Sequence, residues 1–233
     1  MTYEAVIFDL FGTLIDYLPY EEWKRSHSAV ASVMCVSADE VRRAGRVTKP
    51  DRDVGRFGSL ENDIRRICEV LCLSPTAEQI ERVARIRLDI NRRNLETMPK
   101  PGVFETLAAL RRSGRKIGLV SDCTKEIPMV WAESKFAPLM DAAVFSCEAR
   151  VSKPDPRIYE MACERLAVVP EKCLYVGDGG SHELNGAAQV GMTPILIRSY
   201  YDGDYDVSQP DATDWTGLTI SDLSEVMGLL GST

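Results

Sequence analysis

Short apolar runs bounded by turn residues recur along this chain, and helical patterns separate them. The runs are EAVIFDL, KIGLVSD, AAVFSC, CLYVGD and TPILIRS. Their near-continuous hydrophobicity, without a polar residue at every second position, is typical of strands that are buried on both faces of a sheet. Helical patterns lie at 103–112, 125–135, 156–166 and 183–190. Strands that alternate with helices predict an α/β fold with a doubly wound parallel sheet.

The alternation is interrupted between residues 19 and 99, where no strand pattern occurs. Helical stretches are predicted there over 21–36, 38–46, 59–72 and 76–96. The segment VTKPDRDVGRFGS contains Pro and Gly and is predicted to be a linker between two of these helices. An all-helical block inserted after the first strand predicts an α/β core of residues 1–16 and 100–233, with a helical cap of residues 17–99. The polar segment 200–216 is expected on the surface, before a last helix at 221–229.

The net charge, the length of the apolar stretches and the cysteine pattern argue against several classes of function. The 233 residues carry a formal net charge of −7, which argues against a nucleic-acid-binding surface. No apolar stretch approaches the ~20 residues that span a bilayer, and the first residues lack the basic segment of a signal peptide. The seven cysteines are scattered without a CxxC pair, which predicts reduced thiols. We therefore expect a cytoplasmic protein without nucleic-acid or membrane partners, and the sequence leaves its oligomeric state open.

Polar residues stand at the carboxyl ends of the predicted strands. Asp9 ends the first strand, Ser121 and Asp122 end the second, and Asp178 ends the fourth. Lys153 lies in the loop after the third strand. Ligands of an open parallel sheet bind beyond the carboxyl ends of its strands. We therefore expect a candidate nucleophile, a hydroxyl group, a cation and a second carboxylate to meet in one cleft.

Four motifs in this order resemble those of the haloacid dehalogenase-like (HAD) hydrolases. They are DLFGT, VSD, SKPDP and VGDGGSHE, and the helical insertion resembles the C1-type cap of that family. The resemblance extends over most of the chain and implies a hydrolase with a Rossmann-like core. It implies that Asp9 attacks an electrophile such as a phosphoryl group and forms a covalent intermediate. It also implies a Mg²⁺ ion held by Asp9, the backbone carbonyl of Phe11 and Asp178, because this cation prefers oxygen ligands.

The resemblance assigns further site residues to substrate binding. Ser121 and the backbone N–H of Asp122 would hydrogen-bond phosphoryl oxygens. Lys153 would pair with both the nucleophile and the transferring group. The turn at Gly12 and Thr13 would fold tightly around the phosphate. A small phosphorylated metabolite is therefore the expected substrate.

Phe11 departs from the pattern of the HAD phosphatases, which usually carry a second Asp at this position. That acid protonates the leaving oxygen and later activates water, and proton transfer of this kind contributes ~10²–10⁴-fold. The dehalogenases of the family carry an aromatic residue here, so a 2-haloacid dehalogenase that uses Asp9 without a metal is an alternative. Dehalogenases, however, replace the acidic metal ligand of the fourth motif, whereas this chain keeps Asp178 and adds Glu183. Three converging carboxylates repel one another unless a cation lies between them, which favours magnesium.

The helical insertion offers residues for two rival reactions. A dehalogenase would need an arginine to hold the substrate carboxylate, and the insertion contains Arg42, Arg43 and Arg46. The phosphonatases of the family lack the second acid and use a cap lysine as a Schiff base, for which Lys24 and Lys49 are candidates. A catalytically weakened protein that binds phosphorylated metabolites, without any turnover, is a hypothesis from a different class.

The sequence thus predicts a magnesium-dependent phosphatase with specialised proton chemistry. His182 in the fourth motif is expected to cap the next helix or to face solvent rather than to transfer protons. His27 lies on an amphipathic helix of the insertion and faces either the cleft or water.

Overall fold

The computed structural model describes residues 2–198 and 209–231. Its six strands pair in parallel in the order β3-β2-β1-β4-β5-β6. They are β1 (Ala5–Phe8), β2 (Lys116–Ser121), β3 (Ala142–Phe145), β4 (Cys173–Gly177), β5 (Thr193–Ile197) and β6 (Leu218–Ile220). In the register of the sheet, Phe8 of β1 lies opposite Leu119 on one side and Val176 on the other. The chain order turns back at β1, which confirms the predicted doubly wound parallel sheet.

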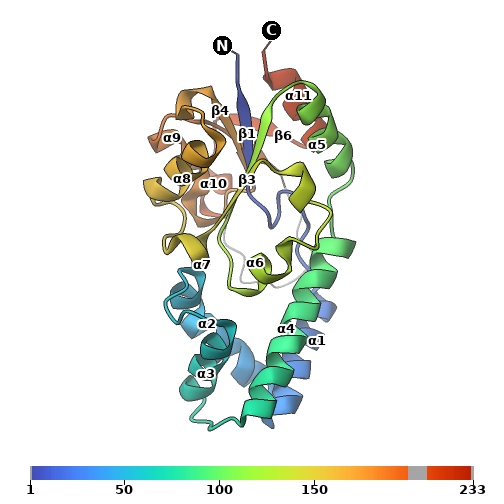
Figure 1. The fold of residues 1–233 in the computed structure, drawn as a ribbon, viewed down its shortest axis with the longest axis vertical. Helices are drawn as coiled ribbons and strands as arrows, with labels where there is room; N and C mark the ends of the chain where they lie inside the picture. The colour runs from blue at the N-terminus through green and yellow to red at the C-terminus, as the bar shows by residue number, and fades with distance from the viewer. Residues whose placement is uncertain (1, 199–208, 232–233) are drawn as a thin grey trace.

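Helices cover both faces of the sheet, so β1 contributes side chains to two separate hydrophobic cores (Figure 1). Phe8 packs into the core beneath α5 (Val103–Arg112), α6 (Glu126–Trp131) and α11 (Val226–Leu229). Ile7 packs on the opposite face with α8 (Pro156–Leu166) and α9 (Glu183–Gln189). The shorter helical turns are η1 (Ala137–Leu139), α7 (Ser146–Ala149), η2 (Pro170–Lys172), η3 (Gly180–His182), α10 (Pro210–Thr213) and η4 (Leu223–Glu225). Burial on both faces explains the continuous apolar runs.

The residues between β1 and α5 form a helical insertion at the end of the molecule opposite the chain termini (Figure 1). Its helices are α1 (Tyr20–Met34), α2 (Ala38–Asp53), α3 (Leu60–Val70) and α4 (Ala77–Thr97). Helices α1, α3 and α4 enclose a third hydrophobic core that includes Met34, Ile64 and Val83. Ser37 and Thr76 cap α2 and α4 with reciprocal capping boxes. The two chain segments that join the insertion to the sheet run side by side, since the backbone N–H groups of 16 and 100 donate to the carbonyls of 98 and 14.

The predicted linker over 47–59 is wrong for its first half. Helix α2 continues to Asp53 with Pro50 inside it. Proline lacks the N–H group for the helical hydrogen bond, but side-chain donors support this stretch of α2. Thr48 Oγ1 donates to the carbonyl of residue 44 at 2.9 Å, and Arg52 Nη2 donates to the Gly45 carbonyl at 2.8 Å. Only residues 54–59 remain as a loop.

The C-terminal region also differs from the prediction. Strand β6 was not expected, because three residues with an exposed Leu218 carry little strand pattern. The predicted helix at 221–229 is a 3₁₀ turn, η4, followed by the short α11. Residues 200–208 of the predicted surface segment lie outside the described residues. No helix in the described ranges is long and apolar enough to span a membrane.

Candidate active site

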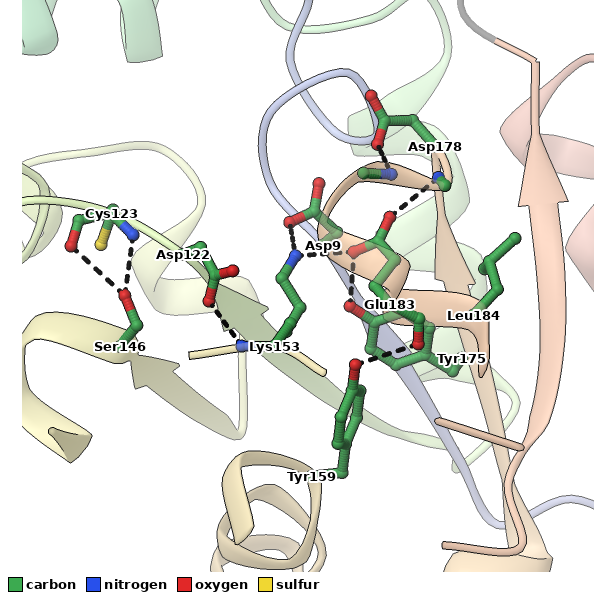
Figure 2. A network of polar contacts seen from close by, with 12 residues as sticks. Asp9, Asp122, Cys123, Ser146, Lys153, Tyr159, Tyr175, Asp178, Glu183 and Leu184 are labelled. Atoms are coloured by element: carbon green, nitrogen blue, oxygen red, sulfur yellow. Dashed lines mark hydrogen bonds and ion pairs between the residues drawn. The ribbon is translucent and has the colours of Figure 1, made fainter. Parts of the chain in front are cut away.

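Three strands of the sheet bring acidic residues to one edge. Asp9 follows β1, Asp122 follows β2 and Asp178 follows β4. Lys153 comes from the loop between α7 and α8, and its side chain points toward Asp9 (Figure 2). These four residues and Phe11 line one cavity of about 540 Å³. The acids and the lysine that were predicted to meet in one cleft therefore do so, whereas Ser121 is buried and does not line this cavity.

A buried lysine links two carboxylates in this cleft. Lys153 Nζ donates to Asp9 Oδ1 at 2.6 Å and to Glu183 Oε2 at 2.6 Å (Figure 2). Glu183 also accepts a hydrogen bond from Tyr175 Oη at 2.9 Å and one from the backbone N–H of Gly179 at 3.0 Å. The side chain of Glu183 is completely buried, so it needs each of these donors.

The position of Glu183 depends on a glycine at the end of β4. A Cβ atom at Gly177 would lie 2.2 Å from Glu183 Oε1. A larger residue would therefore push the Glu183 carboxylate away from Lys153. The glycine that precedes Asp178 at the end of β4 is therefore needed to leave room for Glu183.

Burial and charge shift the pKa values of this group. Burial, opposed by Lys153 and reinforced by the nearby charge of Asp178, raises the pKa of Asp9 to about 6. Burial also raises the pKa of Glu183 well above its ordinary value, against the charge of Lys153. Burial alone would lower the pKa of Lys153, but the carboxylates of Asp9 and Glu183 outweigh it and hold the ammonium form. The carboxyl groups of Asp9, Asp178 and Glu183 thus share this part of the cleft with the single ammonium group of Lys153.

Carboxylate oxygens of Asp9, Asp178 and Glu183 lie within 4.8 Å of one another. Asp9 and Asp178 line the cavity, whereas Glu183 does not, and its oxygens accept hydrogen bonds from Lys153, Tyr175 and the Gly179 N–H. Asp178 is oriented by the Gly180 N–H at 3.0 Å. Several carboxylate oxygens close together fit a Mg²⁺ ion, which prefers oxygen ligands. The predicted ligands Asp9 and Asp178 are therefore compatible with this geometry, and the role of the Phe11 carbonyl stays a prediction.

Two buried hydroxyl groups belong to the predicted substrate-binding set. Ser121 Oγ and Thr13 Oγ1 are fully buried and have no hydrogen-bond partner among the described residues. Gly12, next to Thr13, has a positive φ of 79°, which forms the tight turn after β1. Asp122 accepts a hydrogen bond from the backbone N–H of Lys153 at 3.0 Å, so its own side chain is used to hold that loop.

The comparison with known proteins settles the family. Residues 3–191 match the family of haloacid dehalogenase-like hydrolases. The chain belongs to this family. It is 34% identical over 118 residues to a glyceraldehyde 3-phosphate phosphatase of Methanopyrus kandleri, a match that covers 50% of this chain and 49% of that protein. The chain thus spans about half the length of that relative.

Relatives of this HAD hydrolase include both reaction classes. It is 26% identical to (S)-2-haloacid dehalogenase 4A of Burkholderia cepacia, over 83% of this chain and 82% of that protein. The crystal structure of a HAD phosphatase from Thermococcus onnurineus has a TM-score of 0.65 and 23% identity, and the match covers 98% of each chain. That structural likeness supports the fold alone.

Phe11 occupies the wall of the cavity where the HAD phosphatases usually carry an acid. Its ring stacks on Tyr17 with the ring centroids 6.3 Å apart. The hydroxyl of Tyr17 donates to Asp178 Oδ2 at 3.2 Å. Gln209 Nε2 donates to the same oxygen at 2.8 Å. Phe11 cannot transfer a proton, so any proton-transfer group of this HAD hydrolase must come from another part of the cavity.

The helical insertion supplies the opposite wall. Its residues in the cavity lining are Tyr17, Leu18, Trp23, His27, Arg42, Gly45, Arg46, Lys49, Arg52, Asp53, Asn91 and Asn94. Of the three candidate arginines, Arg42 and Arg46 line the cavity and Arg43 does not, whereas Asp53 was not predicted. Asp53 was missed because its stretch of sequence was interpreted as a linker.

The lysines of the insertion do not have the environment of a Schiff-base lysine. Lys24 pairs with Glu21 at 2.9 Å on the surface. Lys49 forms an ion pair with Asp53, and its side chain is 58% exposed. An amine activated as a nucleophile is usually desolvated. The observed environments therefore do not favour the phosphonatase hypothesis.

The two histidines lie in different surroundings. His182 is 61% exposed in its side chain, and its Nδ1 lies 3.3 Å from Asp211 Oδ1. Asp211 also accepts hydrogen bonds from the N–H groups of Leu184 and Asn185, so this aspartate holds the start of α9. His182 therefore faces solvent next to a helix start, as predicted. His27 lines the cavity, and burial lowers its pKa.

Proposed function

We propose that this HAD hydrolase is a magnesium-dependent phosphatase that acts on a small phosphorylated metabolite. The observation that carries the proposal is the pairing of Asp178 with Asp9 at the cavity wall, within a group of carboxylate oxygens less than 4.8 Å apart. A metal-free halide site has no need for a second acid beside the nucleophile. A phosphoryl group and an anionic nucleophile do need a cation between them.

Each residue of the cleft has a role in this proposal. The Asp9 carboxylate attacks phosphorus and forms an aspartyl phosphate. Lys153 orients Asp9 through the 2.6 Å hydrogen bond and faces the phosphoryl oxygens as a fixed positive charge. The Ser121 hydroxyl, which has no partner among the described residues, and the Asp122 N–H donate to those oxygens. Gly12 and Thr13 shape the turn beneath the phosphate.

The proposed metal site uses the acidic residues of the same cleft. A bound Mg²⁺ would be held by Asp9, the Phe11 carbonyl and Asp178, and it would neutralise the repulsion between the nucleophile and the substrate. Glu183 would stay outside that set, because it does not line the cavity that Asp9 and Asp178 line. Residues 17–99 are proposed to act as a cap that closes over the cavity and excludes water.

A second candidate function is metal-free 2-haloacid dehalogenation. Phe11 favours it, because a halide leaves without a proton, and so does the likeness to the Burkholderia cepacia dehalogenase. The acid at 178 argues against it, since this carboxylate would only add negative charge to a site that must bind a haloacid anion.

One paired assay tests the proposal. Phosphate release from p-nitrophenyl phosphate and chloride release from 2-chloropropionate are measured with Mg²⁺ and with EDTA, for the wild type and for Asp9→Asn. We expect phosphate release that requires Mg²⁺ and disappears in Asp9→Asn. Chloride release that persists in EDTA would replace the proposal by dehalogenation. Ligand-induced thermal stabilisation without turnover in either assay would indicate a binding protein.

A further inference from the structure

All four helices of the insertion line a second cavity, of about 190 Å³ (Figure 1). We name it the insertion pocket. Most of the residues that line this pocket and not the reaction cavity are hydrophobic, among them Val30, Met34, Val41, Ile64, Val83 and Ile90. Protein interiors hold few voids larger than a water molecule. A hydrophobic cavity of this size in so small a helical block therefore calls for an explanation.

The insertion pocket adjoins the reaction cavity that contains Asp9. Five residues line both cavities, namely His27, Gly45, Arg52, Asn91 and Thr124. Among the residues that line the pocket and not the reaction cavity, the charged ones are Arg87 and Glu126, which form an ion pair with each other. Their charges offset one another, so the pocket beyond the shared wall suits an uncharged, hydrophobic group.

Gly45 stands in the middle of α2, at the shared wall. Glycine destabilises a helix interior relative to alanine. Positions three, four and seven apart share one face of a helix, and Gly45 shares its face with Val41, Thr48 and Arg52, which are all buried. A side chain at residue 45 would therefore point into the insertion rather than into solvent.

Packing does not require a glycine at this position. Beyond the neighbouring backbone of α2, no atom of the described residues lies within 4 Å of a Cβ placed at Gly45. A side chain would fit there without a close contact, and it would occupy open space at the wall that the two cavities share. The missing side chain thus keeps this space open, at a cost to the stability of α2.

The size of the insertion pocket limits the group that it can hold. A cavity of about 150 Å³ lined by hydrophobic side chains holds a benzene molecule. The insertion pocket, at about 190 Å³, has room for a short hydrophobic chain or one ring. The hydroxyl groups of a sugar would lose their water there against a mostly hydrophobic wall, which is unfavourable.

We propose that the insertion pocket binds the hydrophobic end of the substrate, while the phosphoryl group of the same molecule lies beside Asp9. The substrate class is then a phosphate monoester that carries an aliphatic or aromatic group at the end away from the phosphate. Gly45 determines this specificity, because it leaves room for that group at the shared wall. The inference rests on the proposed function, which places the phosphoryl group in the reaction cavity.

The test uses n-alkylphosphonates from ethyl to octyl, which carry the same charged head, differ in chain length and are not hydrolysed. Isothermal titration calorimetry with Mg²⁺ should give a Kd that falls about 4-fold with each added methylene once the chain reaches the pocket, as expected for burial of a CH₂ group. Octylphosphonate should also inhibit hydrolysis of p-nitrophenyl phosphate competitively, since its head group occupies the reaction cavity.

Variants at Gly45 locate the effect. Gly45→Leu fills the space at the shared wall, so ethyl- and octylphosphonate should bind to it with similar Kd values. Gly45→Ala should show an intermediate dependence on chain length and a raised Tm, because alanine favours the helix. Gly228→Leu is the matched control, since it adds the same side chain at a helical glycine of α11 that lines neither cavity and has equal space for a Cβ. The control should keep the wild-type dependence on chain length.

Three results would overturn the role of the pocket. They are a wild-type Kd that does not change with chain length, a chain-length dependence that Gly45→Leu retains in full, and inhibition by octylphosphonate that is not competitive. Absence of Mg²⁺-dependent turnover of p-nitrophenyl phosphate in the wild type would instead overturn the proposed function. The calorimetric series does not need turnover, so the two failures are distinguishable.

Discussion

Lys153 Nζ lies 2.6 Å from Asp9 Oδ1, and both side chains are almost completely buried. The same ammonium group lies 2.6 Å from a second buried carboxylate, Glu183. Ion pairs of this kind are weak sources of net stability, but removing one partner leaves a buried charge without compensation. The lysine is therefore as important to the integrity of the cleft as to the chemistry proposed for it.

Lys153→Met should abolish turnover and lower the free energy of unfolding by about 3–5 kcal/mol at pH 8 without metal, as for other broken buried pairs. Mg²⁺ should restore part of that loss, because a cation between Asp9 and Asp178 replaces some of the missing positive charge. Urea unfolding with and without Mg²⁺ measures both effects. Lys116→Met serves as the control, since that lysine contacts the Leu166 carbonyl. Equal unfolding of Lys153→Met with and without Mg²⁺ would argue against a metal at this site.

Asp63 makes stability depend on pH. It is fully buried in the insertion, neither of its oxygens has a hydrogen-bond partner among the described residues, and burial raises its pKa from 3.8 to about 6. Because the folded state binds this proton more tightly than the unfolded state, the fold loses stability as the pH rises from 3.8 to about 6, and the full penalty remains at higher pH. The penalty disappears as the pH falls toward the unfolded value.

Asp63→Asn should therefore stabilise the protein at pH 7.5 by on the order of 1–3 kcal/mol, since each pKa unit corresponds to about 1.4 kcal/mol. The difference from the wild type should shrink toward zero near pH 4. Urea unfolding at the two pH values measures it. A variant that is less stable than the wild type at pH 7.5, or a gain that does not change with pH, would contradict this role of Asp63.

Phe11→Asp should raise turnover of alkyl phosphates, whose leaving oxygen needs a proton, by about 10-fold or more, since general acids contribute ~10²–10⁴-fold. Turnover of p-nitrophenyl phosphate should change little, because nitrophenolate leaves without help. Phe11→Asn has a similar shape without a titratable proton and is the control. Steady-state kinetics on both substrate classes measure this effect. An equal change in Phe11→Asp and Phe11→Asn would mean that side-chain shape, and not proton transfer, causes it.

Gly55→Ala should lower kcat/KM by about 10²-fold, which is a reasonable effect for a displacement of about 1 Å in a site. The added Cβ would meet the Cys147 carbonyl oxygen at 2.0 Å and push the end of α2 from α7. Gly58→Ala is matched, because both glycines have positive φ but no atom lies within 4 Å of a Cβ at Gly58. Gly55→Ala should also lose more stability in thermal unfolding, because Gly58→Ala carries only the strain of its positive φ. Similar kcat/KM values for the two variants would show that the contact between Gly55 and Cys147 does not affect catalysis.

The sheet and its acidic edge could be predicted because they follow from local patterns. Continuous apolar runs identified five strands that are buried on both faces, and the carboxyl ends of parallel strands meet at one edge. That rule alone placed Asp9, Asp122 and Asp178 together. The contact of Lys153 with Glu183 was not predicted, because it depends on the space that Gly177 leaves at the end of β4.

Asp53 could not be found in this way. Pro50 and Gly55 are breaker residues, and they suggested a linker where α2 in fact continues. The donors that support the helix, Thr48 and Arg52, act through tertiary burial that the sequence pattern does not reveal. The close contact between the end of α2 and α7 depends on tertiary packing, and no period in the sequence encodes it.

The most direct test of the proposed chemistry is a crystal structure of the protein with MgCl₂ and beryllium fluoride, a mimic of a phosphoryl group on aspartate. We expect the mimic bonded to an Asp9 carboxylate oxygen, with a Mg²⁺ ion that contacts both Asp9 and Asp178. A structure at saturating concentrations in which no metal lies between these two acids and Asp9 carries no mimic would contradict it.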